Sequence, residues 1–216
     1  MTGLVLKDIL VMRKTLKSYA LFLCLYLLLS LLGIFDIYFV TAMINVIIMM
    51  LPIGTFSYDE VAKWDRYAMS FPLSRRRIVG ARYLFALFMA LMAAAFGLLA
   101  VVLLSIVGNV VLIEALSTIL TSMGVGLFIT DILLPLCYKL GPERARPYLY
   151  LVVFLPLIAL FGSYKLGLLD SIDLSWIDQL PDAGILFVFS LVPLGALAGL
   201  AVSFLISCRI VEQKEF

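Results

Sequence analysis

Six apolar segments, each about as long as a membrane-spanning helix, constrain this chain more than any other feature. They cover residues 19–35, 37–56, 83–107, 116–138, 148–167 and 184–208. A helix needs about 20 consecutive apolar residues to cross the hydrocarbon core of a bilayer. Because lipid offers no hydrogen-bond partner to backbone N–H and C=O groups, each of these spans must be helical. The sequence therefore predicts an all-α, polytopic membrane protein that spans the bilayer six times as a single transmembrane domain.

Composition excludes the alternative that these segments form the core of a soluble domain. Hydrophobic residues make up 64% of the chain and charged residues only 14%, whereas a soluble domain has about 25% charged residues. The chain has too little polar surface to cover itself in water, so the bilayer must be its solvent.

The distribution of charge predicts which side of the membrane each connection faces. With six spans, both termini lie on the same side as the connections 57–82 and 139–147. Of the 16 Lys and Arg residues, only Lys165 lies on the other side. Connections rich in Lys and Arg stay in the cytoplasm, so we expect cytoplasmic N- and C-termini. The outer side carries acidic residues, which are Asp36, Glu114, Asp170, Asp173, Asp178 and Asp182.

Two segments outside the spans have the spacing of short amphipathic helices. In residues 3–18 the apolar stripe consists of Val5, Ile9, Met12 and Leu16, which predicts a helix at the cytoplasmic interface that leads into the first span. In the outer connection 168–183 the apolar stripe consists of Leu169, Ile172, Trp176 and Leu180. We expect a short interfacial or re-entrant helix there, anchored by the tryptophan.

The connection 57–82 has the composition of a surface that binds another protein. Its polar stripe at helical spacing consists of Asp59, Lys63, Arg66 and Ser70, and its aromatic residues include Tyr58, Trp64, Tyr67 and Phe71. Asp59 and Lys63 are spaced for an ion pair on one helix. Aromatic residues and arginine are the usual anchors of protein interfaces. A partner-docking helix is therefore favoured over an ordinary connecting loop.

Two polar residues lie deep within predicted spans. Asp131 is an acidic residue about two turns from the cytoplasmic end of the fourth span, and Asn45 lies in the second. Either residue could line a translocation path. The alternatives are a structural partner for Asp131 and a helix–helix hydrogen bond for Asn45. Small residues spaced by four, such as Gly195, Gly199 and Ser203, mark close helix contacts within the chain or between two copies.

The sequence contains little that could carry out a reaction. Histidine is absent, which excludes proteases and metal sites that depend on imidazole. No phosphate-binding loop motif occurs. The basic run at residues 75–77 lies directly beside a span, where it sets topology and touches anionic lipid rather than nucleic acid. We therefore expect no catalytic residue, metal site or bound cofactor in this chain, and no nucleic-acid partner.

Several short stretches resemble those of a known family. They are Leu-Val-Leu-Lys-Asp at 4–8, Phe-Ser-Tyr-Asp-Glu at 56–60, Lys-Trp-Asp-Arg-Tyr at 63–67 and Pro-Leu-Ser-Arg at 72–75. With the six-span layout, they resemble the ABC-2 type permease subunits of Gram-positive bacterial ABC exporters. Within that family the chain is similar to the short permeases that export phenol-soluble modulins and bacteriocin-like peptides.

The resemblance implies a half-transporter with an ABC-2 (type V exporter-like) bundle in the bacterial plasma membrane. Two permease chains, identical or paralogous, would pair, with a homodimer as the expected form, and separate ATPase subunits would bind ATP and Mg²⁺. The family's coupling helix maps onto residues 58–70, so the implied ATPase-docking residues are Tyr58, Asp59, Glu60, Lys63, Trp64, Arg66 and Tyr67. The family's outer loop maps onto 168–183, which makes Leu169, Ile172, Trp176 and Leu180 the implied extracellular gate. The substrate would be amphipathic, such as a toxin or antimicrobial peptide.

Two other classes of protein fit the same sequence. One is a secondary transporter driven by protons through Asp131. The other is a membrane scaffold or immunity protein that transports nothing.

Overall fold

The computed structural model describes residues 2–64, 67–68, 74–108, 111–167 and 181–213, and these residues form helices joined by short connections, with no strand among them. The helices are α1 (Thr2–Val11), α2 (Arg13–Leu31), α3 (Ile37–Val61), α5 (Arg75–Val107), α6 (Leu112–Leu140), α7 (Pro142–Lys165) and α9 (Asp182–Gln213). Six helices of the described chain, α2 to α9, are long and apolar enough to cross a membrane. The predicted all-α, six-span architecture is confirmed.

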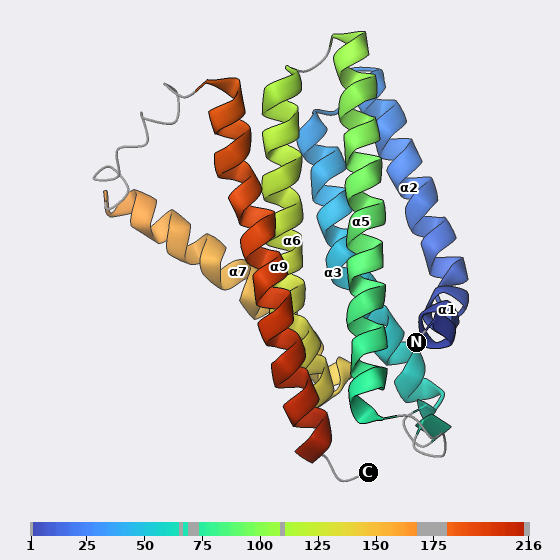
Figure 1. Ribbon diagram of the computed structural model, residues 1–216. Helices are drawn as coiled ribbons and strands as arrows, with labels where there is room; N and C mark the ends of the chain where they lie inside the picture. The colour runs from blue at the N-terminus through green and yellow to red at the C-terminus, as the bar shows by residue number, and fades with distance from the viewer. Residues whose placement is uncertain (1, 65–66, 69–73, 109–110, 168–180, 214–216) are drawn as a thin grey trace.

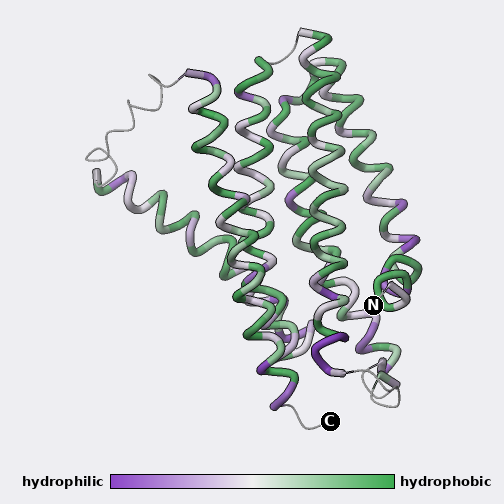
Figure 2. The backbone as a smooth tube through the Cα atoms, viewed as in Figure 1, coloured by the Kyte–Doolittle hydropathy of each residue, from purple (hydrophilic) through white to green (hydrophobic). Residues whose placement is uncertain are grey.

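Five of these helices run side by side, while α7 leaves the bundle at an angle (Figure 1). α1, the start of α5 and the end of α9 lie together at one end, which we call the basic end. The opposite, acidic end carries Asp36, Glu114 and Asp182 at or beside helix starts. Figure 2 shows the apolar character along the spans and the hydrophilic residues gathered mainly towards the ends.

The helices at the basic end are longer than the apolar segments that predicted them. α3 continues to Val61 and α5 already begins at Arg75, so the expected connection 57–82 is much shorter. The expected connection 139–147 is reduced to Gly141, between the end of α6 and Pro142 of α7. A helix satisfies its own backbone groups, so it does not have to stop where the hydrocarbon stops. Gly141 makes the turn with a φ of 84°, and proline suits the first position of the next helix.

The expected interfacial helix 3–18 is wrong in its extent. The chain bends at Met12, and the residues from Arg13 onward belong to the first spanning helix, α2. The apolar stripe of Val5, Ile9 and Leu16 packs against the protein core around the buried Met12. Gly54 of α3 makes room for this contact, because a Cβ there would lie 2.9 Å from the Met12 Cε. α1 is therefore a packed part of the bundle.

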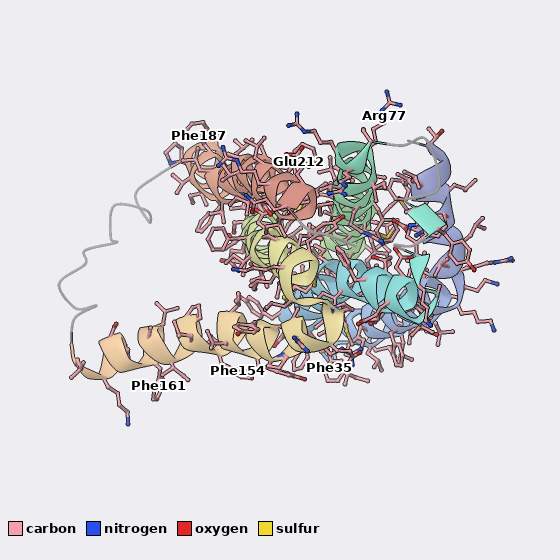
Figure 3. The ribbon with its side chains drawn as sticks, turned by 90° about the horizontal axis from the view of Figure 1, so that it is seen from below. Phe35, Arg77, Phe154, Phe161, Phe187 and Glu212 are labelled. Carbon is pink, nitrogen blue, oxygen red and sulfur yellow. The ribbon has the colours of Figure 1, made fainter. Side chains whose placement is uncertain are left out.

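The core lies among α3, α5 and α6, and α9 makes its most extensive contact with α6. A Cβ at Gly124 of α6 would lie only 2.7 Å from the backbone nitrogen of Pro193 in α9. α7 is mostly uncovered, with Phe154 and Phe161 exposed, and Figure 3 shows both side chains carried away from the other helices. α7 therefore presents its apolar surface to lipid or to another chain.

Candidate functional site

A network of four charged side chains ties three helices together at the basic end. Lys7 and Asp8 come from α1, Asp59 from α3 and Arg82 from α5. The Lys7 ammonium lies 2.7 Å from Asp59 Oδ1 and 3.1 Å from Asp8 Oδ1. The Arg82 guanidinium contacts Asp8 Oδ2 at 3.2 Å and donates a hydrogen bond to Asp59 Oδ2. We call these residues the ion network.

The ion network is more buried than a surface ion pair, so each of its charges depends on its partners. The side chains of Arg82 and Asp8 are only 8% and 5% exposed. Charges removed from water must be paired, because an uncompensated buried charge is costly. Two cations meet two carboxylates here, so the charges balance. Asp59 contacts both cations, and it therefore links the last turn of α3 to α1 and α5.

The predicted ion pair between Asp59 and Lys63 is wrong. α3 ends at Val61, and Lys63 has a φ of 50°. Lys63 therefore does not lie one helical turn beyond Asp59, and the partners of Asp59 are Lys7 and Arg82 instead. Sequence reasoning missed the ion network because its members come from three separate helices. The sequence feature that could have indicated it is the presence of two cations and two carboxylates near the basic ends of α1, α3 and α5.

The predicted ATPase-docking residues divide into an exposed set and a supporting set. Tyr58 is 46% exposed and Tyr67 is 63% exposed, and Glu60 and Lys63 are exposed as well. Because the family resemblance implies that they dock an ATPase, we call these four residues the docking surface. Tyr58 and Glu60 lie in the last turn of α3, whereas Lys63 and Tyr67 follow its end, so α3 positions only the first two on a rigid element.

Asp59 and Trp64 belong to the supporting set. Asp59 is half-buried within the ion network, and the Lys7 ammonium lies 4.3 Å from the centre of the half-buried Trp64 ring. A cation placed over an indole ring is attracted to it. Lys7 of α1 therefore contacts both residues of the supporting set. The predicted Arg66 lies outside the described residues.

A second connection at the basic end joins α5 to α9. Arg75 donates through Nη1 to the backbone oxygens of Val211 and Glu212, at 3.1 and 3.0 Å. Arg76 pairs with the Glu212 carboxylate at 2.7 Å. A cation at the C-terminus of a helix satisfies its last carbonyls and its dipole. The start of α5 therefore contacts the end of α9 as well as the ion network.

Asn45 forms the helix–helix hydrogen bond that was one of its two expected roles. Its Nδ2 donates to Ser122 Oγ at 2.6 Å, which joins α3 to α6. Its Oδ1 is directed at Gly126 of α6, where a Cβ would lie 2.5 Å away. Glycine at position 126 is therefore what lets the amide fit between the two helices.

Asp131 is packed between α6 and α9. It is 7% exposed, and neither carboxylate oxygen has a hydrogen-bond partner among the described residues. A Cβ at Gly199 would lie 2.7 Å from its Oδ2. Its backbone oxygen accepts a hydrogen bond from Ser203 at 2.5 Å, and Ser203 also bonds to the Tyr83 hydroxyl of α5 at 2.7 Å. The expected close contacts at Gly199 and Ser203 are confirmed, whereas nothing lies near a Cβ at Gly195.

The described residues contain no group of three His, Cys, Asp or Glu side chains placed to hold a metal ion. The predicted extracellular gate residues, Leu169, Ile172, Trp176 and Leu180, lie outside the described residues. The site thus consists of an exposed aromatic and charged surface next to the ion network, together with polar groups inside the bundle.

Comparison with known families decides the class of the protein. A family model described as "ABC-2 family transporter protein" matches residues 3–212. The chain belongs to the ABC-2 transporter family. No curated protein and no solved structure gives a significant match. An ABC-2 chain is the integral membrane permease component of an ABC transporter and associates with an ABC ATPase. The family part of the resemblance is confirmed, and the similarity to peptide exporters stays a prediction.

Proposed function

We propose that this chain is the permease subunit of an ATP-driven exporter and that a separate ATPase subunit binds the docking surface. The observation that carries the proposal is the exposed aromatic and charged end of α3 at the basic end of the bundle. By the positive-inside rule, the basic end faces the cytoplasm, where an ATPase can reach it. ATP and Mg²⁺ bind on that subunit, and this chain supplies the path through the membrane.

The ion network gives this docking surface a mechanical connection to the spans. A displacement of the end of α3 acts on α1 and α5 through Asp59, because its carboxylate contacts cations from both helices. The start of α5 is in turn bonded to the end of α9 through Arg75. ATP binding shifts the permease between states only if the ATPase makes different contacts in each of them. The contacts of Asp59 with α5 and of Arg75 with α9 are the route by which these different ATPase contacts would move the spans.

The substrate we propose is an amphipathic molecule, such as a toxin or antimicrobial peptide, that leaves the bacterial plasma membrane between two permease copies. The uncovered apolar surface of α7 supports pairing with a second copy, which we expect to be identical. Asn45 and Asp131 remain the candidates for path residues among those considered from the sequence, and residues 168–183 remain the candidate outer gate.

A proton-coupled secondary transporter is the second candidate function. The observation that favours it is the buried Asp131 carboxylate, which has no hydrogen-bond partner in the described part of the chain. Intramembrane carboxylates commonly serve proton relays. ATP-driven export is favoured because the chain belongs to an ABC transporter family.

Replacing both exposed tyrosines of the docking surface should separate the permease from its ATPase. In the Tyr58→Ala/Tyr67→Ala variant we expect at least a tenfold loss of ATPase co-purification, because aromatic anchors each contribute on the order of 2 kcal/mol at protein interfaces. The folded permease should remain in the membrane, since both side chains are exposed.

The matched control for this experiment is Tyr164→Ala. This tyrosine is 66% exposed but lies near the far end of α7, away from the docking surface. It should leave co-purification unchanged. Equal ATPase recovery with the double variant and the control would show that the docking assignment is wrong.

A further inference from the structure

A groove lined by hydroxyl groups runs between α3 and α6 in the half of the bundle nearer the acidic end. Its volume is about 440 Å³, and Phe189 of α9 lies at its edge. The hydroxyl and amide side chains that line it are Tyr38, Thr41, Asn45, Ser117, Thr118, Thr121 and Ser122. At about 1.5 Å per residue, Thr121 lies about 14 Å along α6 from its first residue. The groove therefore reaches well into the membrane.

Four of the hydroxyl protons in this groove are already used by the protein. Ser117 and Thr118 donate to the backbone oxygen of Glu114 at 2.9 and 2.7 Å. Thr121 donates to the backbone oxygen of Ser117 at 2.8 Å, and Thr41 donates to the backbone oxygen of Tyr38 at 2.9 Å. A hydroxyl that donates its one proton still has lone pairs to accept with. These four side chains consequently offer acceptors, and we call the site the acceptor groove.

An acidic cavity lies next to the acceptor groove at the end of the bundle. Its volume is about 490 Å³, and its lining includes the exposed carboxylates of Asp36 and Glu114. Tyr38 and Thr118 line both the acidic cavity and the acceptor groove, so the two sites are contiguous. Carboxylates are also acceptors and carry negative charge. Along this route the lining favours a cation that donates hydrogen bonds.

Further along α6 and α9, an apolar hollow of about 460 Å³ opens on the surface between the two helices, with Val125, Phe128 and Leu191 of its lining exposed; we call it the apolar cavity. On α6, Val125 of this cavity lies one helical turn beyond Thr121 of the acceptor groove. On α9, Val192 lies about one turn beyond Phe189. The apolar cavity thus follows the acceptor groove along both helices, and polar and apolar compartments meet at one level of the membrane.

We propose that the acceptor groove and the apolar cavity together bind a cationic amphiphile that carries N–H donors. A primary ammonium or guanidinium group lies against the hydroxyl oxygens, and the hydrocarbon part lies in the apolar cavity. A quaternary ammonium has the same charge but no N–H group, so it cannot use the acceptors. The inference rests on the proposed function in one respect, which is that this amphiphile is taken to be the exported substrate. Binding of the amphiphile to the groove requires no ATPase.

Binding of two matched amphiphiles to the full-length chain tests this proposal. The probes are dodecylammonium and dodecyltrimethylammonium, measured by equilibrium binding to the protein in nanodiscs of phosphatidylcholine and phosphatidylglycerol, with empty nanodiscs subtracted. We expect dodecylammonium to bind at least about tenfold more tightly, because hydrogen bonds that involve a charged group are the stronger kind. Thr118→Val/Thr121→Val removes two acceptors and keeps the shape, so the preference should fall to about twofold or less.

The matched control is Thr130→Val on the same helix. The Thr130 hydroxyl also donates to its own helix, at 2.8 Å to the Gly126 oxygen, but it is buried and does not line the acceptor groove. This variant should keep the wild-type preference for dodecylammonium over dodecyltrimethylammonium. That result would show that the loss of preference in the double variant is specific to the groove. Equal affinity of the wild-type protein for the two probes would overturn the proposal. An unchanged preference in the double variant would overturn it too.

Two sources of a primary ammonium can be separated in the same assay. Phosphatidylethanolamine is a membrane lipid with this headgroup, and it can be added to the nanodiscs. Competition with dodecylammonium would support the ammonium site and identify lipid as an occupant. Unchanged affinity would support a site reserved for another amphiphile. ATPase recovery with the tyrosine variant is independent of these results, so failure of the docking assignment and failure of the ammonium site are distinguishable.

Discussion

Replacement of Arg82 by methionine is expected to lower the free energy of unfolding of this protein by about 3–5 kcal/mol. The change removes the cation that contacts Asp8 and Asp59, and it leaves both carboxylates in a buried site with only Lys7. Methionine keeps much of the volume of the side chain, so the loss reflects charge more than packing. Reversible unfolding in mixed micelles, followed by circular dichroism, measures the difference.

Two further variants show whether the ion network is the cause. Arg76→Met removes a cation from the same helix, nearly two turns before Arg82, but its pair with Glu212 is exposed, so it should change stability little. Adding Asp8→Asn to Arg82→Met removes one unpaired charge and should restore part of the loss. If Arg82→Met is no less stable than Arg76→Met, the ion network does not hold these helices together.

Replacement of Gly124 by alanine is expected to separate α6 from α9 and to cost about 1–3 kcal/mol, as is typical of overpacking a close contact. The new methyl group would lie 2.7 Å from the backbone nitrogen and 2.8 Å from a backbone carbon of α9, at Pro193 and Val192. Backbone atoms cannot rotate away as a flexible side chain can, so the helices themselves must move. The same unfolding assay measures the cost.

Gly195→Ala on the facing helix is the control for this prediction. No atom lies within 4 Å of a Cβ at Gly195, so alanine should be tolerated there and should even favour the helix slightly. Equal stability of the two alanine variants would show that α6 and α9 are not in close contact at Gly124.

The six spans could be predicted from the sequence because lipid demands long apolar helices, and their number needs only the length of each apolar run. The ends of the helices could not be predicted in the same way. Residues 57–60 and 75–82 are polar enough to read as a connection, yet they continue α3 and α5. Hydropathy reports where the hydrocarbon ends, whereas helix ends depend on capping and on contacts such as those of Asp59.

The candidate sites show the same division between local and distant contacts. The exposure of Tyr58 and the contact made by Asn45 follow from residue type and spacing, and both were considered from the sequence. The ion network depends on three helices meeting at one place, and the sequence of any one helix does not predict that contact. The acceptor groove also requires two facing helices. The sequence feature that could have indicated it is the cluster of hydroxyl residues at 117–122. The fold places this cluster opposite Thr41 and Asn45.

Export in cells that carry an inactive ATPase tests the central claim most directly. The measurement is the release of a fluorescently labelled cationic amphipathic peptide by cells that express the permease with its ATPase partner. ATP-driven export predicts that release stops when the ATPase cannot hydrolyse ATP. Release that continues with the inactive ATPase and stops in Asp131→Asn would contradict it and would identify a proton-coupled transporter.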